Sequence, residues 1–484
     1  MNLQVLPEPD LEFAKDKYPC PRIGIASFDV YDSKFEIRRN RINIGAVGTE
    51  KGLEKLRIWL ERCQSPIEAK KDTLQRNLYP AFPGFNADNG FKATLVISDE
   101  GFKSIVDDEL SKVINNSLTH EQRVQKALDL YKKPIKFLAR TRKAIDVIIC
   151  VLPDELYDVI AKESVEEERD EEIEQSIAET EDKVPDLENN FRRALKAESL
   201  QLEKPLQIIR EKSLTNLSPQ DAASKAWNFC TAIYYKTNQT VPWKLVNNAN
   251  EPSVCFVGIG FFRSRDREVI HTSLAQIFDE LGNNVILRGG QAYLDDKGDR
   301  RPHLTGDQSI ALLGRAIDDY ILANETHPAR LVIHKTSLFT EEEKEGFLFA
   351  CKQRGINRVD LVTFLDTTDR AFRIGQYPPL RGTLISFDKV AHLLYTRGAV
   401  PFYKTYTGLY IPQPIEIRIA HSDSSVEKIA REILGLTKMN WNSTRFDGKY
   451  PITLRCSQKV GEIMKYLKED YEPKPDVISY GYYM

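Results

Sequence analysis

Five polar side chains between positions 192 and 236 could together bind a phosphate group. Arg192 and Lys196 lie four residues apart in a segment with helical spacing, so both project from one helix face. Gln207 and Arg210 follow in a strand-like segment, and Lys236 ends the next helical segment. An arginine fork, lysine charges and an amide donor can surround a terminal phosphate. The same cations could instead be a solvated helix face and a lysine favoured by the helix dipole.

The composition sets the class of protein in which these residues must work. The 484 residues suffice for two or three domains, and 41% hydrophobic with 29% charged residues is ordinary for a globular protein. No apolar run approaches the roughly 20 residues of a membrane-spanning helix, and the N-terminus lacks a signal peptide, so we expect a cytoplasmic protein. The seven cysteines form no CxxC pair, and we expect reduced, buried thiols without a zinc site.

The net charge of −3 hides an uneven distribution along the chain. Residues 163–182 carry eleven acidic residues and one basic residue, a net of −10, so the remainder carries −3 − (−10) = +7. We expect an exposed acidic insert at about 163–185 on a basic body. A basic body is compatible with a polyanionic ligand, although charge alone does not require one.

The first half reads as mixed α/β structure that ends in a turn near Pro242 and Trp243. Apolar or β-branched runs predict strands at Ile23–Phe28, Thr94–Ser98, 146–153 and Leu206–Arg210. Helical spacing predicts helices at Glu50–Cys63, Gln122–Leu138, Asp154–Lys162, Leu187–Ser199 and from Pro219 to Lys236. We expect Pro134 to kink or divide the second of these helices.

The second half alternates strands and helices more plainly, as an RNase H-like domain does. The predicted strands are Ser253–Phe262, Asn284–Leu287, Arg330–His334, Arg358–Phe364, Thr383–Phe387 and Ile415–Ile419. The predicted helices are Thr305–Asn324, Thr340–Arg354, Ser424–Leu434 and Ser457–Lys468. Thr340 and Glu343 form a capping box, and Gly355 provides a stop.

Several segments, in the same order along the chain, resemble prokaryotic short Argonautes. DVIICVLPDELYDVI resembles the apolar strand and LP turn of the family's MID domain, and AWNFCTAIYYKTNQTVPWKL (226–245) is similar to its MID-to-PIWI junction. VGTEKGLEKLRIWLERCQSPI (47–67) and LYPAFPGF (78–85) resemble its N-terminal part, and residues 433–464 resemble the end of its PIWI domain. The likeness covers nearly the whole chain, so we expect no N-terminal lobe or PAZ domain of long Argonautes.

The resemblance implies a Rossmann-like MID domain followed by an RNase H-like PIWI domain. We therefore expect an N-terminal segment plus MID domain over residues 1–245 and a PIWI domain over residues 246–484. Arg192, Lys196, Gln207 and Lys236 match the family's pocket for a guide 5′-phosphate. Eukaryotic relatives usually place tyrosine where this chain has Arg192, so Tyr157, just after the LP turn, is a rival candidate for that position.

Two further pocket features come from the resemblance. Arg210 could contact the second phosphate or the first base of the guide. In some prokaryotic relatives the terminal carboxylate and a metal ion complete the pocket, which here implies a Mg²⁺ site formed by Gln207 and the carboxylate of Met484. The aromatic tail could equally well pack on the surface without binding a metal.

The carboxylates of an RNase H-type nuclease are missing from their expected positions. Such an enzyme needs several acids that converge on two metal ions. Gly260, Thr336 and Cys456 stand at the matching places, and Lys335 beside Thr336 would repel the ions. Asp295, Asp296 and Asp299 lie in one loop and cannot replace a site built from several elements. We therefore expect no catalytic residue and no catalytic metal in the PIWI domain.

The resemblance implies a subunit of a prokaryotic immune system. It would bind a small guide RNA, or DNA, with a 5′-phosphate, recognise complementary single-stranded DNA, and activate a partner in which an APAZ region is fused to an effector. That effector would be a SIR2 or TIR domain that consumes NAD, or a nuclease, in a heterodimer or a higher oligomer.

Two other readings remain open from the residues. The first is a Rossmann-type nucleotide-binding enzyme using Gly258 and Gly260, although the third glycine of that fingerprint is Arg263. The second is an active slicing Argonaute, which the missing carboxylates oppose.

Overall fold

The computed structural model describes residues 1–36, 38–71, 76–115, 117–141, 144–160, 190–215, 221–238, 240–246, 253–277, 284–294, 300–371, 378–403, 405–406, 411–468, 471 and 479–484. The acidic insert lies outside these residues, as do Asp295, Asp296 and Asp299.

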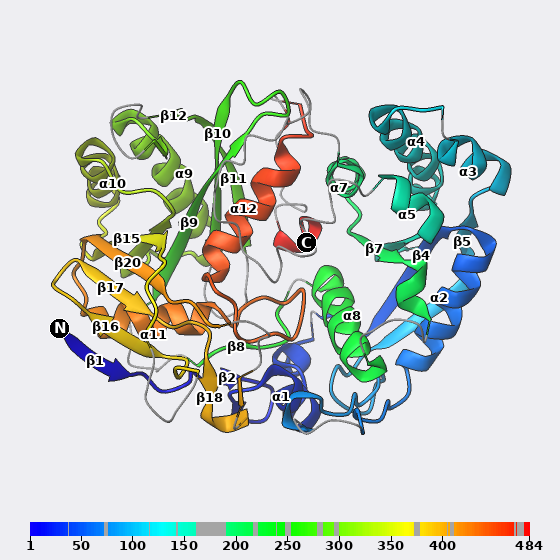
Figure 1. The fold of residues 1–484 in the computed structure, drawn as a ribbon, viewed down its shortest axis with the longest axis horizontal. Coiled ribbons are helices and arrows are strands. Elements are labelled where there is room, and N and C mark those ends of the chain that lie inside the picture. The colour runs from blue at the N-terminus through cyan, green and yellow to red at the C-terminus, as the bar shows by residue number, and fades with distance from the viewer. Residues whose placement is uncertain are drawn as a thin grey trace.

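The first half is a three-layer unit around a parallel sheet, drawn at the right of Figure 1. The sheet has the order β5-β4-β6-β7, from β4 (Arg41–Gly48), β5 (Thr94–Ser104), β6 (Val147–Leu152) and β7 (Leu206–Arg210). One face packs against α2 (Glu50–Cys63) and α8 (Ala222–Thr237). The other face packs against α3 (Asp107–Ile114), α4 (His120–Ala139), α5 (Asp154–Ile160) and α7 (Phe191–Gln201). Strand β6 is buried on both faces, which explains its continuous apolar run.

The second half is built on a mixed sheet of nine described strands, in the order β1-β16-β17-β20-β15-β14-β9-β10-β11. The strands are β1 (Asn2–Val5), β9 (Val254–Arg263), β10 (Ile270–Ile277), β11 (Asn284–Gln291), β14 (Arg330–Lys335), β15 (Val359–Asp366), β16 (Thr383–Ser386), β17 (Ala391–Leu394) and β20 (Ile415–His421). Helices α9 (Gly306–Asn324) and α10 (Glu341–Gln353) cover one face. Helices α11 (Val426–Leu436) and α12 (Ile452–Met464) lie on the other.

Other short elements, besides several 3₁₀ turns, belong to the described part of the chain. They are α1 (Pro21–Phe28), the small sheet of β2 (Leu11–Glu12), β3 (Lys17–Tyr18) and β8 (Lys244–Leu245), and the two-stranded pairs β12 (Tyr293–Leu294) with β13 (Pro302–His303) and β18 (Ala399–Val400) with β19 (Thr405–Tyr406). Among the helices described, none is both long and apolar enough to cross a membrane.

One hydrophobic core runs through both halves of the molecule. The Trp243 indole donates a hydrogen bond to the Lys438 carbonyl at 3.0 Å, and Trp441 donates one to the Trp243 carbonyl at 3.0 Å. The Tyr235 ring stacks on Trp441 with ring centres 4.9 Å apart. The junction near residue 243 is therefore packed, and the expected division at residue 245 stays a prediction.

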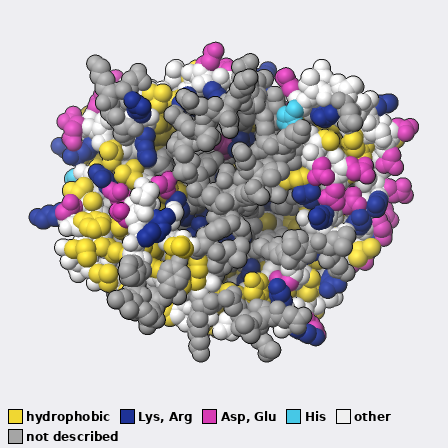
Figure 2. Space-filling model, in the orientation of Figure 1, with side chains coloured by type: hydrophobic (Ala, Val, Ile, Leu, Met, Phe, Trp, Pro, Cys, Tyr) yellow, Lys and Arg dark blue, Asp and Glu magenta, His cyan; other side chains and the backbone are white. Residues whose placement is uncertain are grey.

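The N-terminal strand belongs to the edge of the second sheet, because β1 pairs antiparallel with β16. Its Leu3 and Val5 side chains are exposed, as are Phe387 and Val390 of the neighbouring hairpin. Figure 2 shows hydrophobic side chains gathered at the lower left, where Figure 1 places β1, β16 and β17. This end of the sheet is thus less covered than its centre.

Most expected elements are confirmed to within a few residues, and the seven cysteines are buried and form no disulfide. The predicted strand at Ile23–Phe28 is wrong, because these residues form helix α1 with Pro21 in its first turn. Gly24 lets that helix approach Phe13 closely, since a Cβ there would lie 2.1 Å from the ring. The closing helix α12 begins at Ile452, earlier than expected, and α4 runs through Pro134 without division.

Candidate anion-binding pocket

Two buried lysines from different helices meet at one backbone carbonyl. Lys196 on α7 and Lys236 at the end of α8 donate hydrogen bonds to the Leu206 carbonyl, at 3.3 and 3.1 Å. Lys236 also donates to the Gln207 side-chain oxygen at 2.5 Å. The two lysines are only 3% and 6% exposed. The fold therefore brings together Lys196, Gln207 and Lys236, three of the residues that the sequence proposed.

This cluster holds more positive charge than its surroundings balance. Among the described residues, no carboxylate lies within ion-pair distance of either lysine. Burial holds the pKa of Lys196 well below its usual range, and the charges of Lys236 and Arg192 lower it further. Burial and then Arg192 lower the pKa of Lys236 to about 7. Buried cations without counter-charge are costly, so the pocket favours an anion.

A cation of the second half of the chain, which sequence reasoning missed, acts on Lys196 from a distance. Lys459 on α12 is exposed, and its charge makes the smallest of the named contributions that lower the pKa of Lys196. Helix α7 lies between α4 and α12 in Figure 1. Its Arg193 forms an ion pair with Glu462 of α12, and the Asn190 backbone donates to the Tyr466 hydroxyl at 2.8 Å. The pocket therefore lies where the two halves meet.

Arg192 and Arg210 lie in different surroundings. Arg192 is exposed on α7, one turn before Lys196, and its charge acts on both lysines. Arg210, at the end of β7, stacks its guanidinium 3.5 Å from the centre of the Tyr157 ring. It also lies 3.4 Å from Asp154 and 3.5 Å from Asp158, both on α5. Arg210 therefore contacts three residues of α5, among them Tyr157, the rival candidate for the first pocket position. It does not share the hydrogen-bond partners of the two lysines.

The C-terminal tail packs into the wall of the pocket. Tyr480 and Met484 are both 4% exposed, and the C-terminus lies at the centre of the molecule in Figure 1. A Cβ on Gly481 would lie 3.3 Å from the Lys236 Cα atom, so the tail backbone runs directly against α8. Packing of the aromatic tail without a metal ion would bury these residues in the same way. Metal binding by Gln207 and the Met484 carboxylate stays a prediction. In the described part of the chain, no group of three or more His, Cys, Asp or Glu residues is arranged to hold a metal ion.

The three positions that the sequence resemblance assigned to nuclease carboxylates lie on β9, just after β14, and on α12. Gly260 is covered by α12, and a Cβ there would lie 2.9 Å from the Ser457 hydroxyl oxygen. The Thr336 carbonyl accepts a hydrogen bond from Arg301, and Cys456 is 1% exposed. His334 beside them is bonded to Thr453 at 2.8 Å, and burial lowers its pKa to about 3, so its ring is neutral.

Lys335, which we expected to repel metal ions, has a carboxylate partner of its own. Its ammonium is 0% exposed and forms an ion pair with Glu343 of α10, which is equally buried. His303 lies 3.4 Å from the same carboxylate. The charge of Lys335 is thus neutralised within the fold.

The two glycines of the incomplete dinucleotide fingerprint lie inside strand β9. Gly258 and Gly260 pair with β10, and α12 packs on them so closely that a Cβ on Gly258 would lie 2.2 Å from the Thr453 carbonyl oxygen. A dinucleotide fingerprint needs a turn between a strand and a helix N-terminus. These glycines instead make room for helix α12.

No protein-family model and no curated protein matches this sequence, but solved structures match the fold. Clostridium butyricum Argonaute bound to a guide DNA and a target DNA matches with a TM-score of 0.67 at 15% identity, over 97% of this chain and 53% of that one. Drosophila Piwi matches with a TM-score of 0.58 at 14% identity, over 100% of this chain and 56% of that one. Marinitoga piezophila Argonaute, in complex with a 5′ OH guide RNA, matches with a TM-score of 0.56 at 13% identity, over 100% of this chain and 59% of that one.

The chain spans a little more than half the length of each of these proteins. At such low identities the likeness concerns the fold. The chain thus has an Argonaute-like fold of the mixed α/β class, with a Rossmann-like MID domain followed by an RNase H-like PIWI domain.

Proposed function

We propose that this chain binds a small guide nucleic acid by its 5′-phosphate. The observation that carries the proposal is the pair of buried ammonium groups on Lys196 and Lys236, which share one carbonyl and have no carboxylate partner among the described residues. A terminal monophosphate offers several oxygens and more negative charge than an internal phosphodiester. It would satisfy both lysines at once and offset the cost of their burial.

Residues near the two lysines could make further contacts with such a phosphate. Gln207 would donate its amide, Arg192 would reach the phosphate from the exposed side of α7, and Lys459 would contribute from α12. Arg210 would join only if it left the carboxylates of α5. Because both halves contribute, the bound phosphate would also stabilise their interface.

A guide held in this way would pair with a complementary strand. Base pairing then supplies the sequence specificity, while the protein contacts the backbone and shape of the duplex, as in other guided systems. The solved Clostridium butyricum relative holds a guide DNA and a target DNA. For this chain, the resemblance of its sequence to short Argonautes favours an RNA guide and a single-stranded DNA target.

We further propose that the chain does not cut its target. The sequence places glycine, threonine and cysteine where three elements would each supply a carboxylate. The output would then come from a partner protein, an APAZ-linked SIR2, TIR or nuclease effector in the cytoplasm, which acts in immunity against phages or plasmids. Incubation of the purified chain with a guide, a matched target and divalent ions tests the first part. Cleavage that chelation abolishes and repurification retains would refute it.

A Mg²⁺ ion could assist phosphate binding, with the Gln207 oxygen and the terminal carboxylate of Met484 as its protein ligands. When bound, the ion would neutralise part of the phosphate charge. In the present structure the Gln207 oxygen accepts a hydrogen bond from Lys236, so it would have to exchange an ammonium for the ion. Affinity for a 5′-phosphorylated RNA, measured with and without Mg²⁺, tests this arrangement.

The main test compares the affinity of the purified chain for one short RNA with a 5′-phosphate or a 5′-hydroxyl. We expect a large preference for the phosphate, which Lys196→Ala and Lys236→Ala remove. Lys126→Ala, an exposed lysine on α4, serves as the control and should keep the preference. Equal, salt-sensitive binding of both RNAs would show only a basic surface and would refute the pocket.

A further inference from the structure

The C-terminal end of helix α4 carries a second cluster of cations, separate from the lysines of the pocket. Between Tyr131 and Thr141 the sequence contains Lys132, Lys133, Lys136 and Arg140 and no acidic residue. A surface hollow is lined here by Lys136, Phe137, Arg140 and Thr141. Two of these cations thus line an open hollow on the surface of the N-terminal half.

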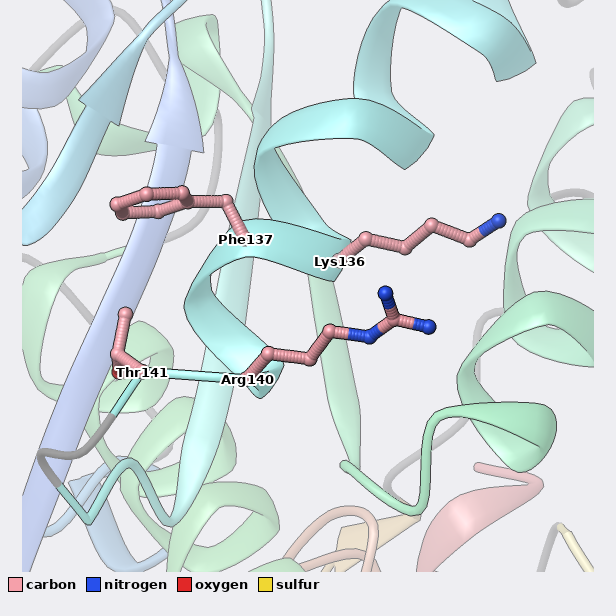
Figure 3. A pocket seen from close by; sticks show the side chains of 4 residues that line it. All are labelled: Lys136, Phe137, Arg140 and Thr141. Carbon is pink, nitrogen blue, oxygen red and sulfur yellow. The ribbon is translucent and has the colours of Figure 1, made fainter.

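The spacing of these cations aligns them along one face of the helix. Lys132, Lys136 and Arg140 follow one another at intervals of four residues. Figure 3 shows the Lys136 and Arg140 side chains projecting from α4 in the same direction. Lys132 is neutralised by an ion pair with Glu198 of α7, which joins the two helices. Within the described part of the chain, no carboxylate pairs with Lys136 or Arg140.

An exposed aromatic ring belongs to the residue that follows Lys136 on α4. Phe137 is 56% exposed, and the Lys103 ammonium lies 4.6 Å from the centre of its ring. Figure 3 shows Phe137 and Thr141 on the opposite side of the helix from the two cations. The end of α4 thus carries two cations on one side and an exposed ring on the other. Proteins that bind single-stranded nucleic acids use cations for the phosphates and aromatic rings for the bases.

We propose that this end of α4 is a contact site for single-stranded nucleic acid, in which Lys136 and Arg140 bind backbone phosphates and Phe137 packs against a base. The inference extends the proposed function, because α4 packs on α7, the helix that carries Arg192 and Lys196. It does not need a terminal phosphate, so it can be tested apart from the pocket. Helix-dipole stabilisation alone would also favour cations here, but it does not require a neighbouring exposed ring.

The test measures the salt dependence of binding to a short single-stranded RNA with a 5′-hydroxyl. Each lost phosphate contact lowers the slope of log affinity against log salt by about 0.7 for single strands. The double variant Lys136→Ala with Arg140→Ala should therefore lower the slope by about 1.4 relative to the parent chain. Phe137→Ala should weaken binding with an unchanged slope, because it removes no charge.

The matched control is Lys112→Ala with Lys126→Ala, which removes two exposed cations from α3 and α4. A slope in the Lys136 and Arg140 double variant equal to that of this control would overturn the proposal. The proposal would also be overturned if the Lys136 and Arg140 double variant kept its RNA binding but lost binding of polyglutamate. That result would show that the surface binds an acidic protein. Thermal unfolding of each variant separates loss of binding from loss of folding.

The ratio of affinities for 5′-phosphate and 5′-hydroxyl RNA separates this site from the pocket. We expect the α4 variants to keep the parent's ratio while their salt slope falls. A reduced slope in a chain without any 5′-phosphate preference would refute the pocket and leave the α4 site standing. A parent chain that prefers the 5′-phosphate, combined with α4 variants whose salt slope equals the parent's, would support the pocket and refute the α4 site.

Discussion

Replacement of Lys236 by methionine should separate the binding role of this residue from its effect on stability. The Lys236 ammonium donates two hydrogen bonds, to Leu206 and Gln207, in a buried site. A hydrogen bond to a charged partner contributes about 1.5–3 kcal/mol. If one such bond to the phosphate is lost, affinity for a 5′-phosphorylated guide should fall by a factor of about 10 to 150, at about 1.4 kcal/mol per tenfold.

The stability of the same variant should change in the opposite direction. The folded pKa of Lys236, about 7, lies below its usual 10.5, so the unfolded chain binds more protons between these values. The parent's stability therefore rises with pH across this window, and the cost of the buried lysine is fully present below about pH 7. Lys236→Met removes that cost. We expect the unliganded variant to be at least as stable as the parent near pH 6 to 7, with an advantage that shrinks toward pH 10.5.

The assay pairs equilibrium binding of both RNAs with denaturant unfolding of the unliganded chain. Loss of the 5′-phosphate preference together with undiminished stability supports the account. A folded Lys236→Met variant that keeps the parent's preference would refute the reasoning. A variant that is strongly destabilised at pH 7 would show that the lysine has a counter-charge after all.

Three other perturbations test further parts of the structure. Affinity for a 5′-phosphate should fall as pH rises above about 7, because Lys236 must then take up a proton on binding, and titrations at several pH values should show a weaker trend in Lys236→Met. Gly260→Asp should destabilise the chain by about 1–3 kcal/mol in denaturant unfolding, because its side chain meets Ser457, and should produce no target cleavage. Lys335→Met should cost about 3–5 kcal/mol, because it leaves the buried Glu343 carboxylate without its ion pair. An unfolding free energy equal to the parent's would contradict that assignment.

The core of the pocket could be anticipated from local spacing. Lys196 follows Arg192 by one helical turn, and Gln207 is the second residue of a strand that the apolar pattern predicts. Lys236 lies at the end of a helix whose boundaries are readable from its sequence. No local pattern shows that both lysines bond to the same Leu206 carbonyl, because that contact depends on how α7 and α8 pack around β7.

Other features depend on contacts between distant segments and were missed for that reason. The charge of Lys459 acts on Lys196 because α12 packs beside α7, and the contacts of Arg210 depend on the position of α5. Strand β10 was not predicted because its hairpin turn uses Arg267 with φ 62°, a conformation that usually indicates glycine or asparagine. The apolar run Ile23–Phe28 predicts a strand, whereas Pro21 begins a helix there.

The most direct measurement of the central claim is an experimental structure of this chain with a short 5′-phosphorylated RNA. The account predicts that the terminal phosphate lies within hydrogen-bonding distance of the ammonium groups of both Lys196 and Lys236, with the Gln207 amide beside it. A 5′-phosphate bound elsewhere, with both lysines still donating to the Leu206 carbonyl, would contradict it.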